Sequence, residues 1–454
     1  MTEREISPLD GRYRERLADL PVYFSDFALM KTRCEIELAY LEALDRTGLF
    51  PALSNGERDR IEHVRSAFSD TDYERIAAID RRVNHDVKAC ELYLREALEL
   101  ADPNRIHFGL TSEDVDNLAY GLLLSRYRDE RQMPLLRRLI ERLATMADTW
   151  STVVFPGRTH GQAASPTTLG KEIAVFLSRL LRQARQLERH RFRGKLNGAT
   201  GTHAAAAVAF PDHDWIAFSD AFVESLGLEP NRCTTQIEDH DSLAEYFAIV
   251  SRVLSIVRDL DQDLWEYISR GDLIERAVDT EVGSSTMPHK VNPIRFENSE
   301  GNVAIADALL SALSDDLTRS RMQRDLSDKT VKRNIGVAMA HGHLAIGQTL
   351  EGLGRIDIDE ARLRETVDGT PEVLAEAMQT ILRAAGVDDP YERLRALTRG
   401  VLLTPDRLAV FIDELPIPER VKTRIRALRP CDYTGLASRI CEGVVAEARA
   451  WLDG

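Results

Sequence analysis

The sequence predicts an all-α protein with three domains, of which the central one is a bundle of long helices. Three observations support this prediction. The chain has 454 residues, more than one hydrophobic core usually holds. Its apolar residues are mostly Leu, Ala, Ile and Val with few aromatics, a mixture that favours helix. Long stretches repeat apolar residues at helical spacing, and none of useful length alternates as a strand does.

The longest expected helices lie in the middle of the chain. Four segments carry apolar residues at helical spacing: residues 171–191, 241–269, 297–314 and 330–353. Thirty helical residues span about 45 Å, and helices of that length pack most simply side by side in an elongated bundle. We therefore expect an N-terminal helical domain at residues 1–102, the central bundle at 103–354 and a C-terminal helical domain at 355–454.

Several residues indicate where helices begin and end. Thr111 or Ser112 is a good N-cap, and the acidic residues that follow suit the positive end of the helix dipole. Pro134 should kink or end the next helix. Gly227 is typical of the position just after a helix.

Charge and cysteine usage exclude several classes of protein. The formal net charge of −15 argues against binding to nucleic acid or to an anionic membrane. The five cysteines are scattered without a CxxC pair, which argues against a disulfide framework or a zinc site and favours a reducing cytoplasm. The charged first residues do not resemble a signal peptide, and no run of about 18 apolar residues suggests a membrane span. We expect a cytoplasmic protein without metal or cofactor.

The most informative segment is Gly283-Ser284-Ser285-Thr286-Met287-Pro288-His289-Lys290-Val291-Asn292-Pro293. Its glycine and serines make a polar loop, and its prolines prevent a regular helix. Lys290 supplies a cation and Asn292 a neutral amide, a pair that suits an anion held against a hydroxyl. Composition alone would still favour a surface loop between two helices.

Two other segments have both a structural and a functional interpretation. Arg158-Thr159-His160-Gly161-Gln162 contains a lone histidine, which is usually structural but can also hold and release a proton near neutral pH. Gly109-Leu110-Thr111-Ser112-Glu113-Asp114 is a helix cap with an acidic first turn, and a helix N-terminus is also an anion site.

Together these three segments resemble the signature motifs of the fumarase/aspartase superfamily, whose members eliminate fumarate from succinyl compounds. The resemblance implies that Ser284 is the general base and that His160 is the general acid that protonates the leaving nitrogen. Lys290 would stabilise the charge that develops on the substrate, together with Asn292. Glu297 would hydrogen-bond the catalytic histidine and keep it protonated. By the same resemblance, Thr111 and Ser112 bind a carboxylate of the succinyl group.

Four further segments resemble the bacterial form of the adenylosuccinate lyase family within that superfamily: residues 7–13, 84–89, 234–238 and 321–334. The resemblance implies that His85 lines the site, either assisting His160 or positioning substrate. It places these further residues on the substrate: Arg12, Tyr13, Asn84, Asp86, Gln236, Asn298, Arg324, Lys329, Thr330 and Arg333. Arg324 and Arg333 suit the nucleotide phosphate because a guanidinium is always charged and binds in bidentate fashion.

The sequence departs from the bacterial pattern at three places. Asp116 stands where Asn is usual, and Lys329 stands where a small hydroxyl residue is usual, although a cation there still suits phosphate. Gly201-Thr202-His203-Ala204 replaces a Gly-Asn-Tyr-Asn-like run, which puts local substrate contacts in doubt.

The resemblance implies an activity and an assembly. The expected reactions release fumarate from adenylosuccinate to give AMP and from SAICAR to give AICAR. The expected assembly is a homotetramer in which three subunits build each site. The alternatives are an argininosuccinate lyase or an aspartase, a non-catalytic helical scaffold, and a nucleic-acid-binding regulator. The phosphate-type arginines argue against the first two, the catalytic set against the scaffold, and the acidic charge against the regulator.

The remaining histidines have structural interpretations. We expect His190 and His240 to be helix-surface or packing residues. His341-Gly342-His343 is too short and isolated for a metal site.

Overall fold

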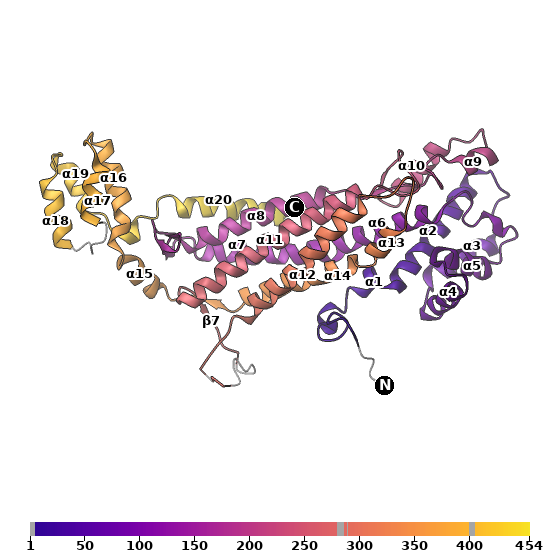
Figure 1. Cartoon of the computed structure of the whole chain (residues 1–454), viewed down its shortest axis with the longest axis horizontal. Coiled ribbons are helices and arrows are strands. Elements are labelled where there is room, and N and C mark those ends of the chain that lie inside the picture. Colours follow the sequence, from indigo (N-terminus) through magenta and orange to yellow (C-terminus); the bar gives the residue numbers. More distant parts are fainter. Residues whose placement is uncertain (1–4, 279–285, 288, 399–404) are drawn as a thin grey trace. The chain divides into compact units, whose positions relative to one another are not determined.

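The computed structural model describes residues 5–278, 286–287, 289–398 and 405–454. The fold is all-α, as predicted, and every strand in this part of the chain is two residues long (Figure 1). The chain divides into two compact units, each made of three segments. Unit 1 comprises Met1–Leu136, Gln183–Ser255 and Ser299–Gly347; unit 2 comprises Arg137–Arg182, Ile256–Asn298 and Gln348–Gly454. The division into three domains stays a prediction.

Unit 1 contains the N-terminal helices and most of the short elements that follow them. Its elements are η1 (Arg14–Leu17), α1 (Pro21–Phe24), α2 (Asp26–Thr47), α3 (Asn55–Ser66), α4 (Asp70–Val83), α5 (Asp86–Leu98), η2 (Pro103–Arg105), α6 (Ser112–Tyr127), the π turn η3 (Arg128–Gln132), β5 (Arg193–Gly194), α9 (Ala204–Ala209), α10 (Trp215–Ser225), β6 (Glu229–Pro230) and α13 (Ser327–Lys332). Helix α2 packs against α4, α5 and α6 (Figure 1). Ile61, Ile76 and Leu94 are fully buried in the apolar core of this region.

Unit 2 contains most of the hairpin strands and the C-terminal helices. Its elements are β1 (Val154–Phe155), β2 (Arg158–Thr159), β3 (Gln162–Ala163), β4 (Thr167–Thr168), β7 (Ile274–Glu275), β8 (Ile356–Asp357), α15 (Glu360–Asp368), η4 (Pro371–Leu374), α16 (Ala375–Ala384), α17 (Pro390–Thr398), α18 (Pro405–Glu414), α19 (Glu419–Arg426), η5 (Pro430–Asp432) and α20 (Ala437–Leu452). Helices α16 to α19 lie together (Figure 1), and Met378, Leu382 and Ile412 are buried in their core.

Five long helices contribute residues to both units: α7 (Met133–Thr149), α8 (Leu169–Arg189), α11 (Asp241–Arg270), α12 (Ile294–Leu317) and α14 (Ile335–Leu353). Three of them confirm the helices predicted from apolar spacing. The prediction of one helix over residues 330–353 is wrong, because the chain forms α13 and α14 with a break between them. The backbone N–H of Asn334 bonds to the carbonyl of Val331 at 3.0 Å, a tight turn that ends α13.

The predicted N-cap at Thr111 and the predicted glycine just after a helix at Gly227 are confirmed. Thr111 is the N-cap of α6 and forms a capping box with Asp114. Pro134 is the second residue of α7 and cannot donate a bond to the carbonyl four residues earlier, and the chain there widens into the π turn η3. Gly227 has a φ of +79° just beyond α10, a conformation that glycine adopts without strain. Among the described residues, no helix has both the length and the apolar character that a membrane span requires.

Candidate active site

The first five residues of α6 carry three carboxylates that are buried in unit 1. The side chains of Glu113 and Asp114 are fully buried, and that of Asp116 is 1% exposed. Negative charge is favoured at a helix N-terminus, but a buried charge needs a partner of opposite sign. Each of the three carboxylates meets a cation from a different part of the chain.

Asp116 belongs to a neutral group of four charges, here called the Arg33 cluster: Arg33, Asp86, Asp116 and Lys329. The Nε atom of Arg33 donates to Asp116 Oδ1 at 2.7 Å, and its NH2 atom lies 3.1 Å from Asp86 Oδ2. The Nζ atom of Lys329 lies 2.5 Å from Asp86 Oδ1 and 3.7 Å from Asp116 Oδ2. Two of the sequence-predicted substrate residues, Asp86 and Lys329, are therefore in direct contact. The two departures from the bacterial pattern, Asp116 and Lys329, also face each other with opposite charges.

The charges of the Arg33 cluster stabilise one another against burial. Burial would raise the pKa of Asp86, but the charge of Arg33 and the hydrogen bond from Lys329 hold that pKa well below its usual value. Burial would lower the pKa of Arg33, yet Asp116 and Asp86 raise it. Asp86 stays ionised because the cations are in place.

Asp114 connects the start of α6 to the Gln236 segment. Its Oδ1 atom lies 2.8 Å from Nζ of Lys195, and both side chains are fully buried. Lys195 also donates to the carbonyl oxygens of Gly198 at 2.9 Å and of Gln236 at 2.7 Å. The sequence-predicted Gln236 is thereby held close to Thr111, whose N–H donates to Asp114 Oδ2 at 2.8 Å.

Glu113 belongs to a third group, here called the His240 cluster: Glu113, Glu238, His240, Arg324, Asp328 and Lys332. Nζ of Lys332 lies 3.1 Å from Glu113 Oε1 and 2.8 Å from Asp328 Oδ2. Arg324 donates to Glu113 Oε2 at 3.2 Å. The predicted phosphate ligand Arg324 is thus fixed to the same helix end as Thr111 and Ser112.

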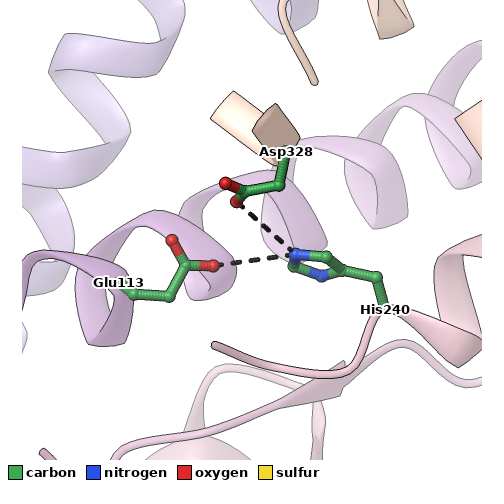
Figure 2. A group of neighbouring side chains, drawn as sticks. All are labelled: Glu113, His240 and Asp328. Atoms are coloured by element: carbon green, nitrogen blue, oxygen red, sulfur yellow. Dashed lines mark ion pairs between the residues drawn. The ribbon is translucent and has the colours of Figure 1, made fainter. Parts of the chain in front are cut away.

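Three residues of this cluster have the side chains of a metal site. Ligand atoms of Glu113, His240 and Asp328 lie within 4.8 Å of one another (Figure 2). The ammonium of Lys332 already occupies the position of a cation between the two carboxylates. A metal ion there would meet a like charge at close range, so we interpret the group as an ion network.

His85 and Ser112 lie together beside the Arg33 cluster. The Nδ1 atom of His85 accepts a bond from the N–H of Lys88 at 3.1 Å and caps α5. Its Nε2 atom lies 3.4 Å from Ser112 Oγ. Because Nδ1 is the acceptor, Nε2 carries the proton of the neutral ring. Asn84 precedes it with a φ of +52°, a conformation that asparagine tolerates.

The other residues of unit 1 that are predicted to contact the nucleotide are more exposed. Arg12, Thr330 and Arg333 are exposed, and Tyr13 is half-buried. Arg333 lines a cavity of about 50 Å³ together with Phe24 and Gly336. The structure brings Arg324 and Lys329 against carboxylates of α6 and α5, and places Arg333 beside this separate small cavity.

His160 is displayed at the tip of a two-residue hairpin in unit 2. Strands β2 and β3 pair Thr159 with Gln162, so His160 and Gly161 form the turn. Their φ angles are +52° and +74°, as a type I′ turn requires at both positions. The motif therefore exposes the imidazole at the tip of the hairpin. Its neighbours Thr159 and Gly161 line a cavity of about 490 Å³.

Two further residues of the predicted catalytic set, Lys290 and Glu297, also lie in unit 2. Lys290 is exposed, and Asn292 and Asn298 are half-buried. Glu297 accepts a bond from Nε1 of Trp265 at 3.1 Å; within the described residues of unit 2 it forms no ion pair with His160. Ser284 lies outside the described residues.

The substituted segment at residues 201–204 packs closely on the Gln236 segment. Gly201 has a φ of +73°, and a Cβ there would lie 2.1 Å from the carbonyl oxygen of Thr234. Only glycine fits this approach. The contact between the two segments therefore depends on Gly201, the one residue of the four that agrees with the expected run.

Sequence reasoning missed the buried ions that hold these residues. Arg33, Lys195 and Lys332 were not singled out, and His240 is a fully buried ion-paired residue where a helix-surface or packing residue was expected. His190 does pack, with its ring 4.7 Å from that of Phe192. One signal was available: lysine is scarce in this chain.

We expect Arg33→Met to lower the free energy of unfolding by about 3–5 kcal/mol at pH 7, because two buried carboxylates lose their cation. The lowered pKa of Asp86 means that its contribution is present above its unfolded pKa of about 3.9 and is lost as pH falls through the folded value. The variant lacks this contribution, so its deficit should hold between pH 7 and about pH 5 and shrink only as the pH falls below about 4. Thermal unfolding followed by circular dichroism over this range measures it.

The matched control is Arg75→Met, which removes an exposed ion pair to Glu96 and should cost at most about 1 kcal/mol. Equal losses in the two variants would contradict the assigned role of Arg33.

Comparisons with known proteins agree with this architecture. The family described as "Lyase" matches residues 22–305, and the family described as "Adenylosuccinate lyase C-terminal" matches residues 320–434. Among solved structures, a 3-carboxy-cis,cis-muconate lactonizing enzyme from Pseudomonas putida superposes with a TM-score of 0.76 at 22% identity, over 96% of this chain and 98% of that one. A fumarate lyase from Mesorhizobium sp. BNC1 gives 0.76 at 19% identity, over 95% and 97%. These two likenesses show the fold.

Sequence relatives are more specific. The adenylosuccinate lyase of Haemophilus influenzae is 43% identical over 445 residues, covering 96% of this chain and 98% of the relative. The adenylosuccinate lyase of Escherichia coli strain K12 is 42% identical over 440 residues, covering 95% and 96%. Identity at this level along nearly the whole length, together with matches to both family models, shows that the chain belongs to the adenylosuccinate lyase family of the fumarase/aspartase superfamily.

Proposed function

We propose that this protein is an adenylosuccinate lyase, which eliminates fumarate from adenylosuccinate to give AMP and from SAICAR to give AICAR. The observation that carries the proposal is the grouping of its predicted substrate residues around the N-terminus of α6. Ser112 lies by His85, and Arg324 contacts Glu113. A helix N-terminus, a histidine and fixed cations together suit a substrate with carboxylates and a phosphate.

The reaction is a β-elimination that needs a base, an acid and a stabilised carbanion. Ser284 removes the proton beside one succinyl carboxylate. Lys290 and Asn292 stabilise the negative charge as it moves onto that carboxylate. His160 protonates the 6-nitrogen of the purine, and the C–N bond then breaks to release fumarate. The exposed position of His160 on its hairpin supports this role, because the imidazole is free to meet a substrate.

The substrate phosphate is assigned to Arg324, Arg333 and Lys329. The side chains of Arg324 and Lys329 are 15% and 18% exposed, so each reaches the surface while its charge is held by carboxylates. Such prepositioned cations cost little reorganisation when an anion binds. Arg12 and Tyr13 contact the nucleotide, and Gln236, Asn84, Thr330 and Asn298 complete the set of substrate contacts.

We propose further that the active enzyme is a cytoplasmic homotetramer in which each site combines residues from three subunits. Within the described residues of unit 2, Glu297 bonds to Trp265 and forms no ion pair with His160. This supports shared sites, since the expected bond between the glutamate and the catalytic histidine would then join residues of two different subunits. Exposed apolar side chains on the long helices, among them Val175 on α8 and Ile305 on α12, provide surface for such contacts.

We expect the purified protein to convert adenylosuccinate to AMP and to release one fumarate per AMP. The loss of the ultraviolet absorbance of adenylosuccinate measures this reaction. Ser284→Ala and His160→Gln should each lower kcat by about 100-fold or more, as loss of general acid or base catalysis does. His63→Gln, which changes an exposed histidine on α3, is the control and should keep normal turnover. Fumarate release from argininosuccinate alone would keep the superfamily and discard the proposed substrate. Near-normal turnover by Ser284→Ala would refute the assignment of the base.

Loss of a phosphate ligand should weaken binding more than turnover. We expect Arg324→Met to raise KM for adenylosuccinate by about 10-fold or more, since a charge-assisted hydrogen bond contributes about 1.5–3 kcal/mol. Arg321→Met is the matched control, because that side chain is 84% exposed on the same segment. Steady-state kinetics on both variants measure this, with circular dichroism to verify the fold. An unchanged KM in Arg324→Met would remove Arg324 from the phosphate site.

Shared sites predict complementation between inactive variants. We expect the homotetramers of Ser284→Ala and His160→Gln to be almost inactive alone, and mixed tetramers refolded together to regain activity, because some sites then receive both intact residues. Light scattering should give the mass of four chains. A monomeric mass with full activity, or refolded mixtures without any gain, would contradict shared sites.

A further inference from the structure

His240 is a buried histidine surrounded by charged side chains from three parts of unit 1. Its Nδ1 atom lies 3.4 Å from Oε2 of Glu238 in its own segment. Its Nε2 atom lies 3.8 Å from Oε1 of Glu113 on α6 and 3.9 Å from Oδ2 of Asp328 on α13 (Figure 2). The imidazole side chain is 1% exposed. It therefore sits where the helix that begins at Ser112, the segment that contains Gln236 and the helix that carries Lys329 meet.

The charges of the His240 cluster balance only when the imidazole is protonated. Its three carboxylates are Glu113, Glu238 and Asp328, each at most 3% exposed. Its permanent cations are two, Lys332 and Arg324. With a protonated His240 the cluster holds three charges of each sign, and with a neutral His240 it holds one uncompensated buried carboxylate. Such a charge is expensive in a buried site.

The surroundings favour the protonated form. Burial and the Lys332 ammonium lower the pKa of His240, but Asp328, Glu238 and Glu113 outweigh them and raise it above its ordinary value. The same contacts hold the pKa of Asp328 well below its usual value against the effect of burial. The contrast is His190, another buried histidine, whose pKa burial and the charges of Arg128 and Arg191 lower to about 4.

We propose that His240 is a positioning residue for substrate binding, whose positive charge sets how strongly Arg324 is held by Glu113 and Asp328. This inference rests on the proposed function, since it takes Arg324 as a ligand of the substrate phosphate. With His240 charged, the carboxylates are shared among three cations and Arg324 is available to an incoming anion. With His240 neutral, the excess negative charge holds Arg324 and repels the phosphate.

The proposal predicts a pH dependence of defined sign. KM for adenylosuccinate should rise as pH increases above the ordinary histidine pKa of about 6.5, because the cluster gains a net negative charge next to an anion site. The effect on kcat should be small, since His240 touches no reacting atom and changes binding of substrate and transition state alike.

The test compares KM from pH 6 to pH 9 in the wild-type enzyme, in His240→Gln and in His240→Lys. The Gln variant has the unbalanced cluster at every pH, so its KM at pH 6 should exceed the wild-type value by about 5-fold, and the two should converge by pH 9. The Lys variant keeps a permanent charge and should hold a low KM throughout. His190→Gln is the matched control, because a neutral buried histidine is replaced by a neutral amide, and its profile should follow the wild type.

A second readout does not depend on turnover. Histidine labelled with ¹³C at Cε1 gives a resonance that His240→Gln identifies by its loss, and this resonance should titrate above pH 6.5. If wild-type enzyme fails to turn over adenylosuccinate while the resonance titrates as expected, the proposed function is wrong and the charge state of His240 stands. If wild-type enzyme is active but the Gln and Lys variants shift KM equally at all pH values, or if His240 is neutral at pH 6.5, the positioning role is refuted.

Discussion

The need to neutralise three buried carboxylates at the start of α6 organises the candidate site. Glu113, Asp114 and Asp116 leave the helix in different directions, and each meets a different cation. Removing such charges from water is costly unless each is paired and hydrogen-bonded. The cost is met only when α2, the Lys195 segment and α13 are all in their native places, so the assembly of the site is tied to the assembly of unit 1.

This arrangement explains why residues predicted to bind substrate, from distant parts of the chain, lie together. Asp86 is held by Arg33, Gln236 by Lys195, and Arg324 by Glu113. None of the three holding residues is an expected substrate ligand. They fix the backbone and the cations in place, and under the proposed function this preserves binding energy that would otherwise be spent on ordering loops. The same networks also keep carboxylates close to the cations that are proposed to bind the substrate phosphate, which is why the proposal links their charge balance to affinity.

Asp116 and Lys329 are two unusual residues whose opposite charges compensate each other. Each alone departs from the bacterial pattern, and Asp116 alone would place an extra negative charge beside Asp86. Lys329 lies 2.5 Å from Asp86 and 3.7 Å from Asp116, so the added charges compensate within the Arg33 cluster. The exposure of His160 has a local cause. The histidine and glycine of the motif adopt the two positive φ angles of the hairpin turn, and this leaves the imidazole exposed.

The sequence by itself determined the helical class, the long helices at residues 171–191 and 241–269, and the caps at Thr111 and Gly227, because periodicity and capping are local properties. Family motifs pointed to the expected catalytic and substrate residues, whose roles remain proposals. Only the tertiary structure revealed the break between α13 and α14, the ion pairs of Arg33 and Lys195, and the burial of His240. These depend on contacts between residues as far apart as Arg33 and Asp116 or Glu113 and Lys332. Pairing of charges across such separations leaves no periodic signal in a single sequence, since any carboxylate can pair with any cation until the fold brings them together.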